Sequence, residues 1–219
     1  MFALPPAIVA DELVRLQTHQ HVVALTFDGG GNADGARGVL ALLRRERVKA
    51  TFFLTGHFVK SYPELARAIG RRYPVGNHTV NHVDLRRLST AAATREILQA
   101  ERMIQSSTGR DPRPYFRFPY GARDGRTLQI VHRLGYASVR WTVDTWGWMG
   151  TSEQSVHGAV RRVVDHLVPG EIVLMHLGSS RDRSTIDTRA LPAVIRAVRA
   201  RGYSFVTLAG IRAPARRGK

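Results

Sequence analysis

Short apolar runs alternate with amphipathic segments of helical length along almost the whole chain of 219 residues. The runs are continuous and rich in branched and aromatic residues, which is typical of strands buried on both faces of a parallel sheet. Strands joined through helices are usually parallel, with right-handed crossovers. The alternation therefore predicts an α/β fold with about seven parallel strands, either an open doubly wound sheet or a barrel. The predicted strands cover residues 22–27, 50–54, 73–75, 115–118, 137–143, 172–175 and 205–208.

The segments between these runs predict helices, and some of their ends carry recognisable signals. Gly109 is placed to end one helix, and Ser152 is a candidate N-cap for another. No internal repeat, low-complexity tract or interior linker divides the chain, so we expect one domain over residues 1–219. Within it, residues 1–20 form a lead-in and residues 210–219 a flexible basic tail. The predicted helices cover residues 35–47, 63–72, 94–108, 125–134, 152–167 and 191–201.

The composition excludes several classes of chemistry. Cysteine is absent, so disulfides and thiolate catalysis are excluded, and any metal ion must be held by His, Asp or Glu. No segment holds the roughly 18 apolar residues of a membrane-spanning helix. The N-terminus lacks the basic region and the long apolar core of a signal peptide. Either the protein is cytoplasmic, or the sequence begins after a removed leader or anchor.

The chain has a formal net charge of +16, and nearly all of its basic residues are arginines. Such a surface attracts polyanions. The body of the chain has no basic cluster with interleaved aromatic residues, so we expect no specific binding to nucleic acid. Two interpretations remain: a solvated basic surface in an arginine-rich proteome, or binding to an anionic polymer such as a cell envelope.

Polar residues suited to metal or acid–base chemistry accompany five of the predicted strands. His78 and His82 are four residues apart in a loop-like stretch after the third strand, and such a pair can bind one metal ion. Because active sites of parallel α/β folds form at the C-terminal edge of the strands, we expect these residues to meet there. Each has a structural alternative, such as a helix N-cap for Asp28, a surface ion pair for Arg117 or a turn for Asp144. The full set is Asp28, His78, His82, Arg117, Asp144 and His176.

Five ordered motifs built around these residues resemble those of the polysaccharide deacetylase family, also called the NodB-homology family or carbohydrate esterase family 4. The similarity runs from about Val22 to Leu208. It implies a deformed (β/α) barrel of about seven strands, in agreement with the alternation above. The motifs are Thr26-Phe27-Asp28-Gly29-Gly30, His78-Thr79-Val80-Asn81-His82, Arg117-Phe118-Pro119-Tyr120-Gly121, Val143-Asp144-Thr145-Trp146-Gly147-Trp148 and Leu174-Met175-His176.

The resemblance implies metal-dependent removal of acetyl groups from N-acetylated sugar polymers. His78 and His82 are expected to hold a divalent ion, most simply zinc, with cobalt, nickel or manganese as alternatives. Asp28 is then the general base and His176 the general acid, while Arg117 orients Asp28. The backbone N–H of Tyr120 is expected to donate to the oxyanion, and Asp144 to be the partner of His176. Pro119, Trp146 and Trp148 are expected to contact the sugar. The alternative for the two tryptophans is packing over the barrel mouth.

Two positions depart from the family pattern. Gly29 stands where the family has an aspartate that binds the metal, and Gly147 stands where the fourth motif has its second aspartate. Asp34 is the best local candidate for the missing metal ligand, because the neighbouring glycines allow the loop to fold back. The alternatives are that Asp34 is a helix N-cap, or that Asp28 itself moves onto the metal.

These residues favour a monomeric deacetylase that acts on peptidoglycan or a chitin-like polymer, outside the cell or at its envelope. An O-acetyl (xylan) esterase uses the same oxyanion chemistry and remains an alternative. A carbohydrate-binding pseudoenzyme that lost its metal with the aspartate is a second alternative. A basic nucleic-acid-binding domain is a third, which rests on charge alone.

Overall fold

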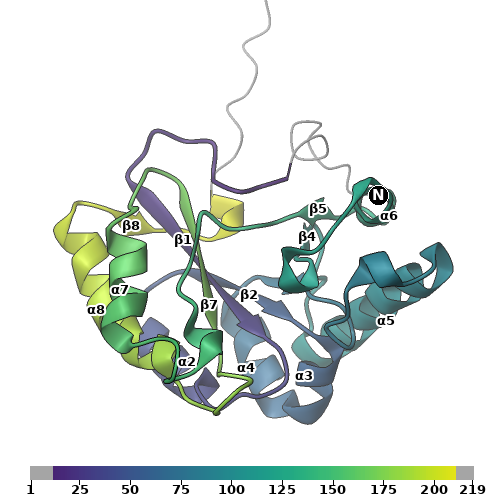
Figure 1. The fold of residues 1–219 in the computed structure, drawn as a ribbon, viewed down its shortest axis with the longest axis horizontal. Helices are drawn as coiled ribbons and strands as arrows, with labels where there is room; N and C mark the ends of the chain where they lie inside the picture. The colour runs from purple at the N-terminus through teal and green to yellow at the C-terminus, as the bar shows by residue number, and fades with distance from the viewer. Residues whose placement is uncertain (1–11, 211–219) are drawn as a thin grey trace, which may run out of the picture.

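The computed structural model describes residues 12–210, which form a curled sheet of eight parallel strands surrounded by helices (Figure 1). Seven strands follow one another in the order β5-β4-β3-β2-β1-β7-β6, and β8 pairs with β1 beside them. The predicted fold is confirmed in its barrel-like form. The strands are β1 (Val22–Gly29), β2 (Ala50–Leu54), β3 (Val75–Asn77), β4 (Tyr115–Phe116), β5 (Ala137–Ser138), β6 (Val143–Asp144), β7 (Glu171–His176) and β8 (Ser204–Phe205).

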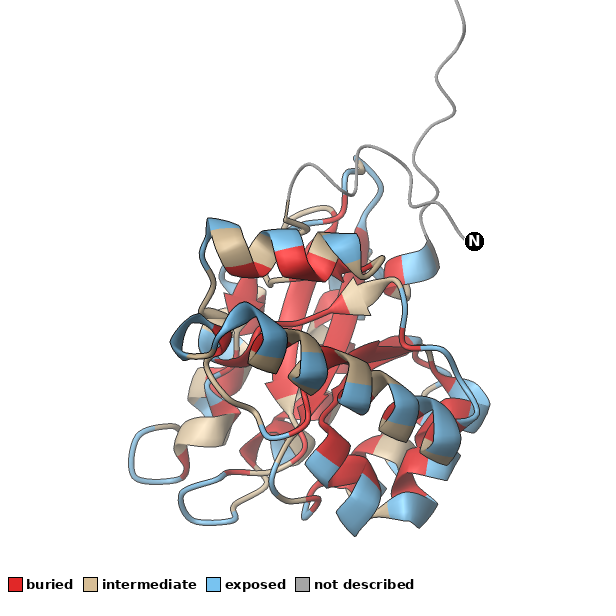
Figure 2. Ribbon diagram, turned by 90° about the vertical axis from the view of Figure 1, so that its right-hand side faces the viewer, coloured by how far each residue is buried: buried red, intermediate tan, exposed pale blue. Residues whose placement is uncertain are grey.

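The helices lie around the sheet with their exposed faces outward, and the buried strands lie between them (Figure 2). Each helix has a buried apolar face, so the main core forms between the sheet and the helices. The helices are α2 (Ala36–Arg45), α3 (Gly56–Ser61), α4 (Pro63–Arg72), α5 (Thr90–Thr108), α6 (Gly125–Arg133), α7 (Val156–Val164) and α8 (Ile186–Ala200), and the short 3-10 turns are η1 (Leu85–Arg87), η2 (Pro119–Gly121), η3 (Gly147–Met149) and η4 (Leu208–Gly210).

Strand β1 is buried along its whole length, as its continuous apolar run predicts. Side chains alternate between the two faces of a strand. Val23, Leu25 and Phe27 join the cluster that packs against the helices, whereas Ala24 joins a separate cluster. Asp28 has the same parity as Ala24 and therefore lies on the face opposite the main helical core.

The segment predicted as one strand over residues 137–143 is two strands, which is a correction. Strand β5 pairs with β4 at one end of the strand order, and β6 pairs with β7 at the other end. The connection between them therefore passes from one edge of the curled sheet to the other. Leu13 pairs with Val139 in this connection, so the described part of the lead-in is attached to the same region.

Several helix boundaries also differ from the sequence-based expectation. Helix α7 begins at Val156, and its N-cap is Ser155 rather than Ser152. Helix α8 begins earlier than predicted, so that Pro192 lies inside it. The six-residue helix α3 was missed because it is too short to show a periodic pattern. Gly109 ends α5 in the left-handed conformation, as predicted, while residues 211–219 of the expected tail lie outside the described residues.

Candidate active site

Asp28 and Arg117 form a buried ion pair at the C-terminal ends of β1 and β4. The Arg117 Nη1 donates to Asp28 Oδ1 at 2.7 Å and to Thr26 Oγ1 at 3.0 Å. Its Nε and Nη2 donate to the carbonyl oxygens of Val139 at 3.3 Å and Arg140 at 3.0 Å. Arg117 is fully buried, so these hydrogen bonds replace the ones that its charged group makes with water in the unfolded chain. The guanidinium thus fixes Asp28 and also holds the connection between β5 and β6.

The charges around Asp28 keep its carboxyl ionised. Burial is the largest influence and acts to raise the pKa, but Arg117, His78 and His176 together outweigh it, so the pKa lies below the usual value. One oxygen, Oδ1, is bound to Arg117, while Oδ2 lies 3.4 Å from His78 Nε2. Asp28 is therefore an oriented carboxylate with one oxygen on the side of the histidines.

His78 is held in the tautomer that suits a metal ligand. Its Nδ1 lies 2.7 Å from the carbonyl oxygen of Arg117, and we assign the ring proton to Nδ1 from this contact. The Nε2 lone pair then faces the Asp28 side. Metal-binding histidines commonly donate their other nitrogen to a carbonyl in this way. Burial also lowers the pKa of His78, which keeps the ring neutral.

His82 lies beside His78 on a loop rather than on a helical turn. The two ring centroids are 4.7 Å apart, and the backbone of His82 is left-handed with φ 56°. Burial, followed by the charge of His78, lowers the pKa of His82 to about 3. Glu96 on α5 accepts hydrogen bonds from the backbone N–H groups of Val80 and Asn81, which fixes the loop between the histidines. Both imidazoles are neutral at pH 7, as metal binding requires.

The side chains around the two histidines are of the types that bind a divalent ion such as zinc, but few such ligands lie close together. His78 and His82 supply two neutral imidazoles, and Asp28 supplies the neighbouring carboxylate. Within residues 12–210 no group of three or more His, Asp or Glu side chains is arranged to hold a metal ion. A Cβ atom at Gly29 would lie 2.9 Å from Leu54 and 3.2 Å from Phe58, so this position faces apolar side chains.

The structure does not bring Asp34 to the histidines, so the predicted third ligand is not supported. The Arg183 guanidinium donates to Asp34 Oδ1 at 2.8 Å, which engages the carboxylate in a surface ion pair. Asn32 donates to the carbonyl oxygen of Ser179 at 2.7 Å, so the loop is tied to the segment after β7. Asp34 is not the N-cap of α2 either, since that position is Gly35.

His176, at the end of β7, has a different carboxylate partner from the one expected. Its Nδ1 lies 3.5 Å from Asp187 Oδ2, and Asp187 is a residue that the motif analysis did not select. Asp144 accepts from the backbone N–H of Trp146 at 2.8 Å and from Trp148 Nε1 at 3.4 Å. Burial lowers the pKa of His176, but Asp187, Asp144 and Asp28 together raise it above the usual value. Asp144 therefore contributes charge, while Asp187 is the nearer partner.

The residues predicted to contact the sugar differ in exposure. Tyr120 has a left-handed backbone, a 72% exposed side chain and a ring centroid 4.6 Å from that of His82. Trp146 is exposed, and the Arg162 guanidinium carbon lies 3.3 Å from its ring centroid. Trp148 is half-buried against Asp144, as described above. Pro119 is buried in η2, which does not favour its predicted contact with a sugar.

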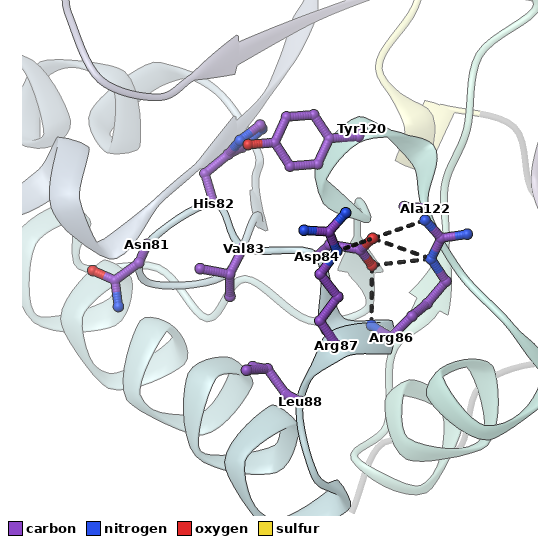
Figure 3. A pocket seen from close by; sticks show the side chains of 9 residues that line it. All are labelled: Asn81, His82, Val83, Asp84, Arg86, Arg87, Leu88, Tyr120 and Ala122. Carbon is purple, nitrogen blue, oxygen red and sulfur yellow. Dashed lines mark hydrogen bonds and ion pairs between the residues drawn. The ribbon is translucent and has the colours of Figure 1, made fainter.

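A cavity of about 690 Å³ opens beside His82 and Tyr120 (Figure 3). Arg86 donates to both oxygens of Asp84, whereas Arg87 Nε lies 3.8 Å from that carboxylate and its side chain is 86% exposed. Two arginines and one aspartate give this cavity a positive balance. The lining residues are Asn81, His82, Val83, Asp84, Arg86, Arg87, Leu88, Tyr120 and Ala122.

Comparisons with known proteins show the family of the chain. Residues 15–139 match the polysaccharide deacetylase family. A chitooligosaccharide deacetylase from Bradyrhizobium is 36% identical over 84% of this chain and 87% of its own length. The chain therefore belongs to the polysaccharide deacetylase family, a family of hydrolases.

Two solved structures resemble the fold closely. The Bacillus subtilis family 4 carbohydrate esterase PdaA, named as a peptidoglycan-N-acetylmuramic acid deacetylase, has a TM-score of 0.83 and 28% identity, covering 93% of this chain and 86% of its own. A family 4 pseudoenzyme from Bacillus anthracis has a TM-score of 0.81 and 28% identity, covering 91% of this chain and 68% of its own. The fold thus occurs in an esterase and in a protein described as a pseudoenzyme. No helix within residues 12–210 is long and apolar enough to span a membrane.

Proposed function

We propose that the protein is a metal-dependent deacetylase that removes acetyl groups from an N-acetylated polysaccharide. The observation that carries the proposal is the position of Asp28 between Arg117 and His78, at 2.7 Å and 3.4 Å, with His176 beside it on β7. An oriented base, a pair of neutral imidazoles and a histidine held near carboxylates are the groups that amide hydrolysis needs. The deacetylases among its relatives support the same reaction class.

In the proposed reaction, each group has one task. His78 and His82 would hold a divalent ion such as zinc, and such an ion would supply Lewis-acid chemistry at this point. Asp28 accepts the proton of the attacking water through Oδ2, because Oδ1 is bound to Arg117. The backbone N–H of Tyr120 donates to the tetrahedral oxyanion. His176 donates a proton to the leaving amine as the C–N bond breaks, which releases acetate and the free amino sugar.

The proposed substrate is an N-acetylglucosamine polymer, either peptidoglycan or chitin-like. Relatives named as chitooligosaccharide and peptidoglycan deacetylases support both. The net charge of +16 favours an anionic cell-wall polymer and a site of action at the cell envelope or outside the cell. The protein acts on this polymer as a monomer.

Acetate release from defined substrates tests the proposal. Zinc-loaded and cobalt-loaded protein is incubated with N-acetylated chitooligosaccharides, peptidoglycan glycan strands and acetylated xylan. We expect acetate from at least one N-acetylated substrate, and a loss of about 10²- to 10⁴-fold in the Asp28→Asn variant. Release from xylan alone identifies an O-acetyl esterase. No acetate from any of the three overturns the proposal.

A carbohydrate-binding pseudoenzyme is a second candidate, favoured by one specific observation. Gly29 has no side chain, and no three-ligand group occurs in the part of the chain that the structure describes. Metal analysis separates the two functions: stoichiometric zinc with acetate release supports the enzyme. Glycan binding without bound metal or acetate release supports the pseudoenzyme.

A further inference from the structure

Two buried polar atoms lack a partner where the proposed general acid meets Asp187. His176 Nδ1 and Asp187 Oδ1 have no hydrogen-bond partner within residues 12–210, although both are shielded from solvent. His176 Nδ1 lies 3.5 Å from the other oxygen of the same carboxylate, Asp187 Oδ2. Buried polar atoms are nearly always paired, so two unpaired atoms on neighbouring side chains call for an explanation. At 3.5 Å, the distance from Nδ1 to this carboxylate is at the limit of a hydrogen bond.

The backbone holds Asp187 in this place independently of the His176 ring. Asp187 lies in the first turn of α8, where the helix dipole favours a negative charge, and it is only 2% exposed. Its Oδ2 accepts a hydrogen bond from the backbone N–H of His176 at 2.7 Å. The carboxylate is thus anchored by the main chain of the residue whose side chain it faces.

Gly147 gives the carboxylate the room that it occupies. A Cβ atom built on Gly147 would lie 2.3 Å from both Cγ and Oδ2 of Asp187, and 2.5 Å from Oδ1. Any side chain at position 147 therefore collides with the carboxyl group of Asp187. Gly147 does not have a positive φ, so its backbone conformation does not require glycine. The space taken by the Asp187 carboxyl does require it. A side chain at position 147 would place its Cβ atom against the carboxyl group of Asp187.

We propose that Asp187 is the positioning residue for His176, and that the absence of a side chain at Gly147 is what admits it. The inference rests on the proposed function, in which His176 is the general acid. By accepting a hydrogen bond from Nδ1–H, Asp187 fixes the ring so that Nε2 carries the other proton toward the leaving amine. Asp144 is engaged by Trp146 and Trp148 and acts on His176 through its charge only.

Moving the carboxylate tests this assignment. In Asp187→Ala we expect kcat to fall by about 10²-fold or more, with KM changed only a few-fold, because Asp187 is buried and so out of the substrate's reach. Gly147→Asp in the Asp187→Ala background puts a carboxyl beside the space that Asp187 leaves, so we expect kcat to recover by at least tenfold over Asp187→Ala. Gly147→Asp alone, which forces both groups into one space, is impaired. A kcat for Asp187→Ala within about twofold of the wild type overturns the proposal.

A second readout does not depend on activity. The ¹⁵N chemical shifts of the His176 ring report which ring nitrogen carries the proton. The other titratable residues near this ring, Asp28, Asp144, His78 and His82, are the same in the wild type and in the variants. We expect protonated Nδ1 in the wild type and a shift toward the Nε2–H tautomer in Asp187→Ala, with Asp187→Asn as an isosteric variant if alanine disturbs folding. Identical tautomers in all three proteins overturn the proposal. An inactive wild type that still shows this shift rejects the proposed function and leaves the contact intact.

Discussion

Asp28 of β1 and His176 of β7 are register partners on adjacent parallel strands. The proposed base and the proposed acid therefore leave the sheet at the same level and from neighbouring positions. Their charges act on each other, since His176 lowers the pKa of Asp28 and Asp28 raises the pKa of His176. When two residues act as a unit in one reaction, replacing both lowers the activity little more than replacing one of them.

This relationship predicts non-additive kinetics. We expect Asp28→Asn and His176→Ala each to lower kcat by about 10²- to 10⁴-fold, and the double variant to be little worse than the more damaged single one. Acetate release at saturating substrate measures the effect. His57→Ala, at an exposed histidine on α3, is the matched control and should retain normal activity. Losses that multiply in the double variant would contradict a joint role.

The buried pair of Arg117 and Asp28 should be costly to break. Replacing Arg117 by Met leaves Asp28 buried without its partner and removes four hydrogen bonds, so we expect the free energy of unfolding to fall by about 3–5 kcal/mol. Denaturant unfolding measures this loss. Arg45→Met, at an exposed pair with Glu46, should change the same quantity by about 0.5 kcal/mol or less. Equal effects of the two substitutions would argue against the buried network.

Metal affinity should distinguish His82 from Asp34. His82→Ala removes one of the two neutral imidazoles, so we expect zinc affinity measured by calorimetry to fall by at least about tenfold. Asp34→Ala should leave that affinity unchanged, because the Asp34 carboxylate is paired with Arg183. A large loss of zinc binding in Asp34→Ala would show that the loop rearranges around the metal and would restore Asp34 as the third ligand.

Glu171 gives the fold a pH dependence that is separate from catalysis. Burial raises its pKa from 4.5 to about 8, and its Oε1 has no partner among the described residues. The folded state therefore binds this proton more tightly than the unfolded state, so its contribution to stability is complete below pH 4.5 and is lost as the pH rises through 8. We expect the loss to reach a few kcal/mol, on the order of 1.4 kcal/mol per pH unit.

Thermal unfolding across this pH range provides the measurement. Glu171→Gln should unfold at a nearly constant temperature where the wild type declines. The exposed Glu64→Gln should follow the wild type, because Glu64 is 77% exposed at the start of α4. A wild type whose stability rises between pH 5 and 8 would contradict a buried neutral Glu171.

Arg87 should matter more for an anionic glycan than for a neutral one. It lies at the cavity beside His82 with a largely exposed guanidinium (Figure 3). We expect Arg87→Ala to raise KM several-fold for peptidoglycan strands, and to leave KM for neutral chitooligosaccharides within about twofold. Arg71→Ala on the exposed side of α4 is the control for net charge. An equal rise in KM for both substrates would remove charge recognition as the reason.

The sequence identified most of the site because its residues follow strand ends. Asp28 ends an apolar run, and His176 ends another, so the rule that parallel strands meet at one edge was enough to group them. Asp187 escaped detection because it lies in the first turn of a helix, and its relation to His176 and Gly147 exists only after the chain has folded. The pairing of Asp34 was hidden for the same reason, because Arg183, which donates to its carboxylate, is distant in the sequence.

The sequence likewise predicted the long strands of the fold but did not separate its shortest strands. Continuous apolar runs identify β1, β2 and β7 because both faces of these strands are covered. The two-residue strands β5 and β6 carry too little pattern to be separated, so a connection that crosses the sheet looked like one strand. Such short strands are defined by their partners rather than by their own residues.

The Arg117 network also has a consequence for how the protein folds. Its guanidinium joins Thr26 and Asp28 to Val139 and Arg140, across sequence separations of 91, 89, 22 and 23 residues. Contacts of such long range must wait for the closure of large loops, which is entropically slow. The Asp28 carboxylate can therefore be paired only after the chain has been built as far as Arg117. A nascent chain that has made only its first strands holds the Asp28 carboxyl without its arginine partner.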